Sequence, residues 1–161
     1  MESIAESSRP SMPAGYGLLD PSEGVGLLPW TTVAQSLTEA RNYWLATTWP
    51  DGRPHCAPVW GVWADGALYF GSDPKSRKGR NLQADPRVCV HLESGDDVVI
   101  VEGVVEEVAG DELASPSRAY AAKYELSGGL GSAAFRVRPQ VVFAWRERDF
   151  PGSATRWRVP P

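Results

Sequence analysis

Apolar residues along the chain follow a helical spacing first and an extended spacing afterwards. Residues 31–41 carry three apolar positions separated by four and then three residues, which predicts a short amphipathic helix with a core face of Val33, Leu37 and Ala40. Thr32 and Gln35 have the spacing of a capping box, so we expect the Thr32 hydroxyl to cap the start of this helix.

From residue 43 onward, β-branched and aromatic residues dominate and turn residues separate them. Pro50-Asp51-Gly52 and Asp65-Gly66 predict two consecutive hairpins. A helical stretch is expected over 111–124, followed by a flexible glycine-rich loop over 127–131. The extended segments predict six strands, at 43–49, 54–63, 67–72, 88–93, 98–108 and 141–146. Hairpin connections and few helices favour a mainly β fold built on an antiparallel barrel.

The first 26 residues differ in composition from the rest of the chain. They are rich in Ser, Pro, Gly and acidic residues, and their few apolar side chains cannot offset the entropy lost on ordering. We therefore expect a flexible N-terminal tail over residues 1–26. Residues 27–161 then form one domain, because 161 residues leave no room for two cores of common size.

The net charge of the chain limits the kinds of partner that it is expected to bind. Sixteen basic and 20 acidic residues give a net charge of −4 and a pI near 5.2, which argues against a nucleic-acid-binding surface. The N-terminus lacks the positive charge of a secretory signal, and no apolar run is long enough to span a membrane. We expect a cytoplasmic protein that binds a small molecule and has neither nucleic acid nor membrane as partner. Cys56 and Cys89 lack Cys-x-x-Cys spacing and are expected as reduced, buried thiols.

A cluster of cations follows the third predicted strand. Ser76 is a natural N-cap for a short helix that ends before Pro86. The residues around the first turn of that helix include four cations, Lys75, Arg77, Lys78 and Arg80. Cations are unfavourable there, because the helix N-terminus already carries a partial positive charge. A phosphate bound to the free N–H groups, with the Ser72 and Ser76 hydroxyls donating, removes this cost. A solvated helix face is the alternative interpretation.

Large aromatic side chains precede this cluster. They are suited to enclose a planar ring system, although aromatic residues in strands more often form the core. The four candidates are Trp60, Trp63, Tyr69 and Phe70.

Three passages resemble the pyridoxamine 5'-phosphate oxidase-like FMN-binding split-barrel superfamily, and within it most closely the flavin/deazaflavin oxidoreductase B group. They are Arg53 to Gly66, Ser76 to Leu82 with its Ser76-Arg77-Lys78 turn, and Phe150 to Arg158; Leu68 to Ser72 and Asp85 to Val88, on either side of the second passage, also match the superfamily. The resemblance covers about residues 30–159 and implies a six-stranded antiparallel split β-barrel. It also implies that the cofactor phosphate is held by Ser72, Ser76, Arg77 and Lys78, with Gly71 as a further cofactor-binding residue.

The same resemblance assigns the rest of the cofactor site. Pro58, Val59 and Trp60 would contact the ring, and Asn81 the linker. Independently of the resemblance, Trp145 and Trp157, near the last predicted strand, would close the ring pocket from that side. Many members of this group use coenzyme F420, and FMN is the alternative cofactor because the first thirty residues offer only Arg9 to a polyglutamate tail.

The chain also departs from true pyridoxamine phosphate oxidases. Ala57 and Val62 stand where the family motif has Arg and Lys, and the C-terminus has no Arg-Leu-His segment. Oxidation of vitamin B6 is therefore not expected. His55 and His91 alternate with apolar residues in strands, so packing roles are expected and no metal site is predicted.

The resemblance favours an oxidoreductase that uses reduced F420 to transfer hydride to an activated double bond of a small organic molecule. The alternatives are an FMN-dependent oxidase or reductase and a non-catalytic haem, biliverdin or flavin-binding protein. The sequence assigns no catalytic residue, and a classical side-chain acid need not be present because the cofactor carries the chemistry. A homodimer is expected, because an open barrel leaves sheet edges that a second copy would cover.

Overall fold

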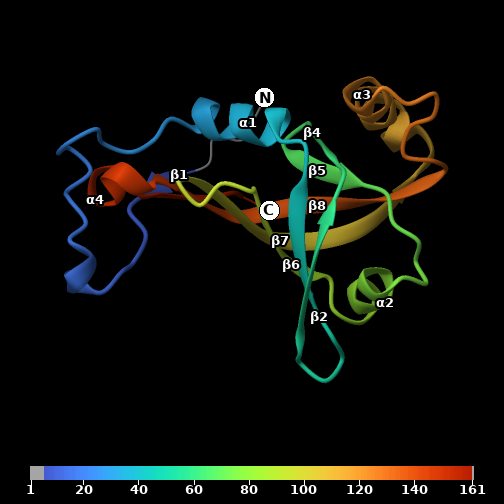
Figure 1. Cartoon of the computed structure of the whole chain (residues 1–161), viewed down its shortest axis with the longest axis horizontal. Helices are drawn as coiled ribbons and strands as arrows, with labels where there is room; N and C mark the ends of the chain where they lie inside the picture. The colour runs from blue at the N-terminus through green and yellow to red at the C-terminus, as the bar shows by residue number, and fades with distance from the viewer. Residues whose placement is uncertain (1–5, 161) are drawn as a thin grey trace.

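Two long antiparallel strands form the spine of the molecule (Figure 1). The computed structural model describes residues 6–160, in which β7 (Asp97–Ala109) pairs with β8 (Ala133–Arg146) over its whole length. The other edge of β7 pairs with β6 (Arg87–His91), followed by β2 (Tyr43–Thr48) and β3 (Pro54–Val59). The pairing of β6 with β2 therefore joins segments that lie far apart in the sequence.

The second edge of β8 is shared between two short strands. Near its start it pairs with β5 (Ala67–Phe70), which in turn carries β4 (Val62–Ala64). Near its end it pairs with β9 (Thr155–Arg158), which carries β1 (Glu6–Ser8). Residues 6–160 thus form a nine-stranded antiparallel sheet that does not close on itself. The predicted mainly β, antiparallel split-barrel fold is confirmed, with nine strands in place of six.

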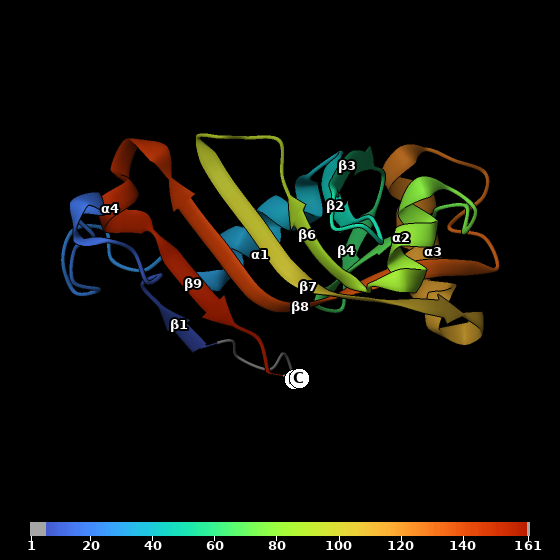
Figure 2. The same cartoon turned by 90° about the horizontal axis from the view of Figure 1, so that it is seen from below.

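Helices lie at both ends of the sheet and along one side of it. α1 (Trp30–Glu39) crosses one side of the strands. α2 (Arg77–Ala84) and α3 (Ala114–Tyr124) lie at one end, and α4 (Phe150–Ser153) lies at the other. Three short 3-10 helices occupy Ala14–Tyr16, Gly110–Leu113 and Glu147–Asp149. Figure 2 shows β6 to β9 side by side, with α1 behind them and α2 at one end. Within residues 6–160 no helix covers the opposite side of the middle of these strands, which is called the helix-free side below.

The core follows the alternation of the strands. From Val99 to Val105 every second residue of β7 is buried, and α1 adds Val33 and Leu37 from the side. A smaller apolar cluster joins β4 and β5 to the region around α3. No helix among the described residues is long and apolar enough to cross a membrane.

Two predicted strand boundaries are wrong for a local reason. The segment expected as one strand over 54–63 breaks at Trp60-Gly61, where a Cβ on Gly61 would lie 2.9 Å from the Tyr69 carbonyl oxygen. The last long strand begins at Ala133 rather than 141, because Pro139 sits opposite an irregularity between Glu102 and Gly103 and does not end the pairing.

The predicted capping box is also wrong. The N-cap residue of α1 is Pro29, no side chain caps this helix, and the Thr32 amide donates to the Pro29 carbonyl at 3.1 Å. Thr32 therefore lies inside the first turn and not before it.

The N-terminal segment makes contacts with the other end of the chain. β1 pairs with β9, and the Arg9 guanidinium donates to the carbonyl oxygens of Leu19 and Ala154 at 3.0 and 2.9 Å. Residues 1–5 lie outside the described residues. Whether the tail over 1–26 is flexible stays a prediction.

We predict that Gly103→Ala destabilises the protein by about 2 kcal/mol. The added Cβ would overlap the backbone carbonyl of Arg138 on the neighbouring strand, and that backbone cannot move without disturbing the β7–β8 pairing. Urea unfolding would measure the loss. Gly95→Ala is the matched control, because a Cβ there meets nothing within 4 Å. Equal stability of the two variants would contradict the prediction.

Candidate functional site

The start of α2 is held by serine hydroxyls and by a glycine. Ser76 is the N-cap, and its Oγ accepts a hydrogen bond from the Gly79 amide at 3.1 Å, as the sequence predicts. The Ser72 Oγ lies 3.1 Å from the Ser76 Oγ. A Cβ on Gly79 would lie 2.6 Å from the carbonyl oxygens of Asp73 and Pro74, so only glycine lets the preceding loop fold back so closely. The loop and the helix start therefore form one compact unit.

Four cations surround this unit without carboxylate partners. Lys75, Arg77, Lys78 and Arg80 make no ion pair within residues 6–160, and no acidic residue lies in the first turn of α2. Burial, and then the charges of Arg80 and Arg53, hold the pKa of Arg77 below its ordinary value. Uncompensated positive charge at a helix N-terminus favours the binding of an anion.

Asn81 fixes α2 to the sheet. Its side chain is fully buried, and its Nδ2 donates to the Thr47 Oγ1 on β2 at 3.0 Å. The Asn81 Oδ1 has no hydrogen-bond partner within the described part of the chain. The contact of Asn81 with a cofactor linker stays a prediction, whereas its packing role is visible directly.

The predicted ring-contacting residues lie at the end of β3. Pro58 is exposed and Val59 is buried, in line with the alternation of the strand. Trp60 is 41% exposed, and its ring stacks on that of Tyr124 in α3 at a centroid distance of 4.5 Å. Gly71 ends the β5 region exposed, and the nearest atom to an added Cβ is 3.9 Å away.

Trp145 is not brought together with the other predicted site residues. It pairs with Val98 near the end of β8, its Nε1 donates to Glu147 at 3.1 Å, and its ring meets Phe150 edge-on at 5.6 Å. This end of β8 leads to α4, and α2 lies at the other end of the sheet (Figure 1). In a single chain, Trp145 is therefore remote from the cation cluster.

Most of the aromatic residues considered as walls of a ring pocket belong to the core. Trp63, Tyr69 and Phe70 are 9%, 4% and 0% exposed. Only Trp60 of the four presents its ring at the surface. Trp63, Tyr69 and Phe70 therefore pack in the core, in agreement with the alternative interpretation of these strand aromatics. Tyr69 also borders a hollow that contains Arg136 and Arg138.

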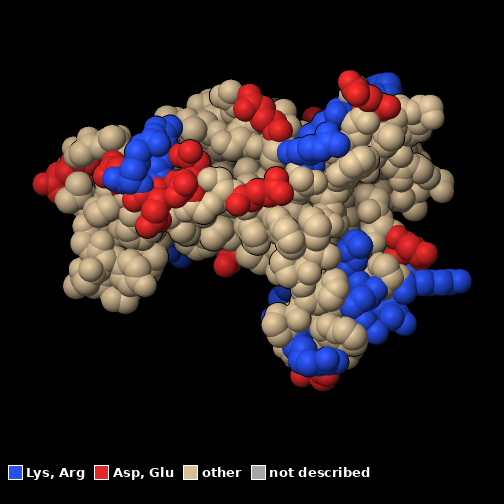
Figure 3. Space-filling model, in the orientation of Figure 1, with Lys and Arg blue, Asp and Glu red and all other residues tan. Residues whose placement is uncertain are grey.

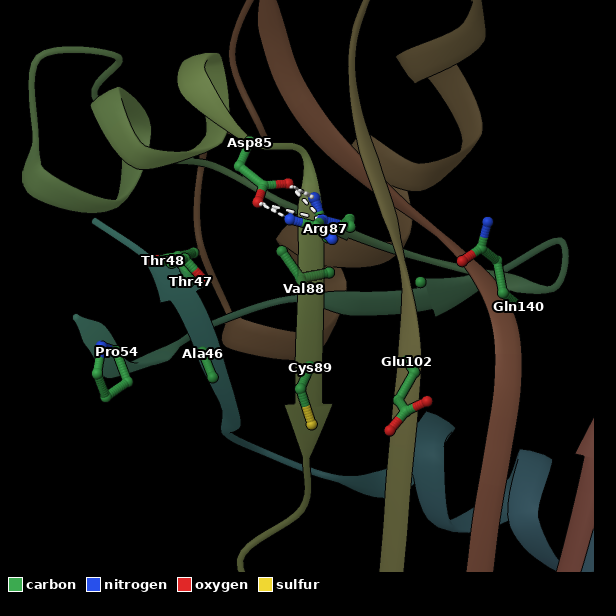
Figure 4. A pocket seen from close by; sticks show the side chains of 11 residues that line it. Ala46, Thr47, Thr48, Pro54, Asp85, Arg87, Val88, Cys89, Glu102 and Gln140 are labelled. Carbon is green, nitrogen blue, oxygen red and sulfur yellow. Dashed lines mark hydrogen bonds and ion pairs between the residues drawn. The ribbon is translucent and has the colours of Figure 1, made fainter. Parts of the chain in front are cut away.

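A hollow of about 510 Å³ lies on the helix-free side of the sheet (Figure 4). Its floor is formed by successive strands, with Ala46 from β2, Cys89 from β6 and Glu102 from β7 in one row. At one end the Arg87 guanidinium binds Asp85 at 2.6 Å and lowers the pKa of that carboxyl to about 2. None of the ten predicted cofactor residues lines this hollow.

The cysteines and histidines occupy the strands as predicted, but not all of them are buried. Cys56 is exposed and Cys89 is half-buried, and both are free thiols. His91 stacks on Trp44 at 6.3 Å, and His55 lies opposite Thr47. Within residues 6–160, His, Cys, Asp and Glu side chains do not gather in groups of three that could hold a metal ion.

Sequence reasoning missed a half-buried lysine near Trp60. The Nζ of Lys123 in α3 donates to the Tyr43 hydroxyl at 2.8 Å and to the Gly61 carbonyl at 3.0 Å. The Tyr124 hydroxyl also donates to the Gly61 carbonyl, at 2.9 Å. These bonds fix the corner between β3 and β4 on which Trp60 stands. A lone lysine in a predicted helix carries no sequence signal for such a role.

Comparison with known proteins agrees with this architecture. A family model described as pyridoxamine 5'-phosphate oxidase matches residues 30–146. The conserved hypothetical protein Rv2991 from Mycobacterium tuberculosis is 27% identical, with 76% of this chain and 88% of that chain covered and a TM-score of 0.66. No curated protein sequence matches the chain.

Two further solved structures are named for their ligands. An F420 reductase is 27% identical, with 67% of this chain and 94% of that chain covered and a TM-score of 0.54. A heme binding protein from Mycobacterium smegmatis is 25% identical, with 74% and 59% covered and a TM-score of 0.54.

We predict that the titration of Lys123 increases the free energy of unfolding as pH rises from 8 towards 10. Burial lowers the pKa of Lys123 from 10.5 to about 8, so in this range the unfolded chain holds a proton that the folded chain has lost. Free energy of unfolding then increases with pH. The measurement is urea unfolding of the wild type and of Lys123→Met across this range, because their difference removes the titration of other groups. A difference that is flat or falls with pH would contradict the prediction.

Proposed function

The chain belongs to the pyridoxamine 5'-phosphate oxidase family, and from that premise we propose that it is an oxidoreductase that binds coenzyme F420. It would use the reduced coenzyme to transfer hydride to an activated double bond of a small organic molecule. The observation that carries the proposal is the group of cations at the start of α2, which lack carboxylate partners within residues 6–160. The similarity to an F420 reductase supports the choice of coenzyme.

The donors at α2 fit a phosphate group. Hydroxyls of Ser72 and Ser76 lie side by side, and the guanidinium of Arg77 and the ammonium of Lys78 belong to the first turn of the helix. Together with the free backbone N–H groups they offer both hydrogen bonds and charge. In this proposal these four residues hold the phosphate, and Gly71 borders them.

The ring of the coenzyme would lie against the end of β3. Pro58 has no backbone N–H, Val59 is buried, and the exposed Trp60 is held in place by Tyr124. Lys123 and Tyr124 fix the Gly61 carbonyl, so this corner is rigid before any ligand binds. A preformed surface keeps the ring orientation fixed without a further loss of entropy.

A second copy of the chain would complete the site. β3 ends the path of the sheet, and the helix-free side carries the partly buried apolar residues Trp44, Ile100 and Phe143. Pairing two copies over this side would bury them, and it would allow Trp145 of one chain to approach the α2 region of the other. We therefore propose a homodimer with the cofactor near its interface, and Asn81 near the linker.

When bound, reduced deazaflavin supplies the hydride. The chain's own residues bind the phosphate, orient the ring and exclude water from the reacting face, so this proposal requires no side-chain acid.

Two alternatives use the same surface. FMN carries a phosphate that the α2 donors would bind equally well, and a structural neighbour from Nostoc punctiforme, at 18% identity, is an FMN-binding protein of this fold. Haem has carboxylates that could meet the same cations, and the similarity to a heme binding protein supports this alternative.

Absorption spectroscopy would separate the three ligands. The protein is titrated in turn with F420, FMN and haem, whose absorption bands differ in wavelength. The proposal predicts that F420 binds most tightly and that reduced F420 is reoxidised when an activated alkene is added. Tight binding of haem alone, with no turnover of either flavin, would replace it with the binding-protein alternative.

Lys78→Ala is predicted to weaken binding of the phosphate-bearing cofactor at least tenfold, about 1.4 kcal/mol. The reason is the loss of one cation from the first turn of α2. Isothermal titration would measure it, with Arg118→Ala as the control because Arg118 is exposed on α3. Unchanged affinity in Lys78→Ala would remove this residue from the site.

A further inference from the structure

The tip of the β2–β3 hairpin lies beside the start of α2. The ring of Trp49, in this tip, stacks against guanidinium groups from two elements. The Cζ of Arg77 lies 3.6 Å from the centroid of the Trp49 ring, and the Cζ of Arg53 lies 4.3 Å from it. Figure 3 shows positive side chains gathered over α2 and the hairpin below it. One aromatic ring thus joins a cation of the helix to a cation of the hairpin.

The backbone of the hairpin fixes the position of this ring. The Trp49 amide donates to the Arg53 carbonyl, and the Gly52 amide donates to the Trp49 carbonyl, both at 2.8 Å. Gly52 adopts φ 87°, a conformation that glycine alone takes readily. Trp49 and Arg53 therefore close the same turn, and neither can move far without opening it.

The charges at this tip are not balanced. Asp51 binds the Nε of Arg53 at 2.8 Å, while Arg77 has no ion pair within residues 6–160. Arg53 and Arg80 lie close enough to Arg77 to oppose its charge, which contributes to the lowered pKa of Arg77. Stacking on Trp49 offsets part of this repulsion, because the face of an indole ring attracts cations.

We propose that the hairpin tip is part of the anion site on α2. Trp49 is a positioning residue that holds the guanidinium of Arg77 at the start of the helix, and Arg53 adds a second guanidinium to the binding of a phosphate-bearing ligand. This inference rests on the proposed function. A free arginine loses much side-chain entropy when it binds an anion, and a guanidinium already stacked on a ring has lost part of it beforehand.

The test compares FMN with riboflavin, which has the same ring system and no phosphate. Trp49→Ala is expected to weaken FMN binding about fivefold, the size of a cation–π contribution, and to change riboflavin binding less than about twofold. Trp49→Phe keeps an aromatic face and is expected to retain most of the FMN affinity. The same series is run with F420 and its phosphate-free chromophore, so that the inference is tested whichever of the two cofactors the protein binds.

Arg53→Gln tests the hairpin cation without removing the ring. It is expected to weaken FMN about threefold and to reduce the dependence of FMN affinity on salt, because one fewer cation faces the ligand. Arg148→Gln, at the opposite end of the sheet near α4, is the matched control. Arg53 is exposed, so the Arg53→Gln substitution leaves the core intact. This variant therefore tests the inference even if Trp49→Ala does not fold.

Three outcomes would overturn the inference. Equal weakening of FMN and riboflavin by Trp49→Ala would mean that Trp49 acts only on folding. Wild-type affinity in that variant would mean no positioning role, and unchanged affinity and salt dependence in Arg53→Gln would remove Arg53. Lys78→Ala separates this failure from that of the proposed function, because it tests the α2 site alone. If the wild type binds neither phosphate-bearing cofactor better than its phosphate-free counterpart, the proposed function fails as well.

Discussion

The pairing of β7 with β8 is the constraint on which the other elements depend. Thirteen residue pairs connect these strands, and the remaining strands attach to their two outer edges. β8 is long enough to carry β5 near its start and β9 near its end. The length of this pairing therefore separates the molecule into an end that holds α2 and α3 and an end that holds α4.

The proposed cofactor site lies at the first of these ends, where cations without carboxylate partners stand on a hydrogen-bonded support. The support comes from two hydrogen bonds: a buried one from Asn81 ties α2 to β2, and a half-buried one from Lys123 ties α3 to the corner after β3. Neither bond involves the cations that face solvent. The chain can therefore place several positive side chains close together, because packing elsewhere holds the backbone against their repulsion.

The distance between Trp145 and α2 along the sheet is the reason why the proposed site needs a second copy of the chain. In one copy, the cations of α2 and the exposed Trp60 lie at one end of the sheet, and Trp145 lies at the other end. The helix-free side of the sheet, with its hollow over Cys89 and Glu102, has the partly buried apolar character of a surface that a second copy would cover. Choice among F420, FMN and haem would then depend on the interface as much as on α2.

The sequence alone determined the features that neighbouring residues specify. Three such features are local: Ser76 as a helix cap, the turn at Pro50-Asp51-Gly52 and the cluster of cations around α2. The residues around α2 also carry part of the family resemblance. Tertiary structure decided the rest, because it depends on contacts between distant segments. Three features depend on how β4, β8 and the hairpin meet their partners. They are the burial of Tyr69, the continuation of β8 past Pro139 and the ring on which Arg77 stacks.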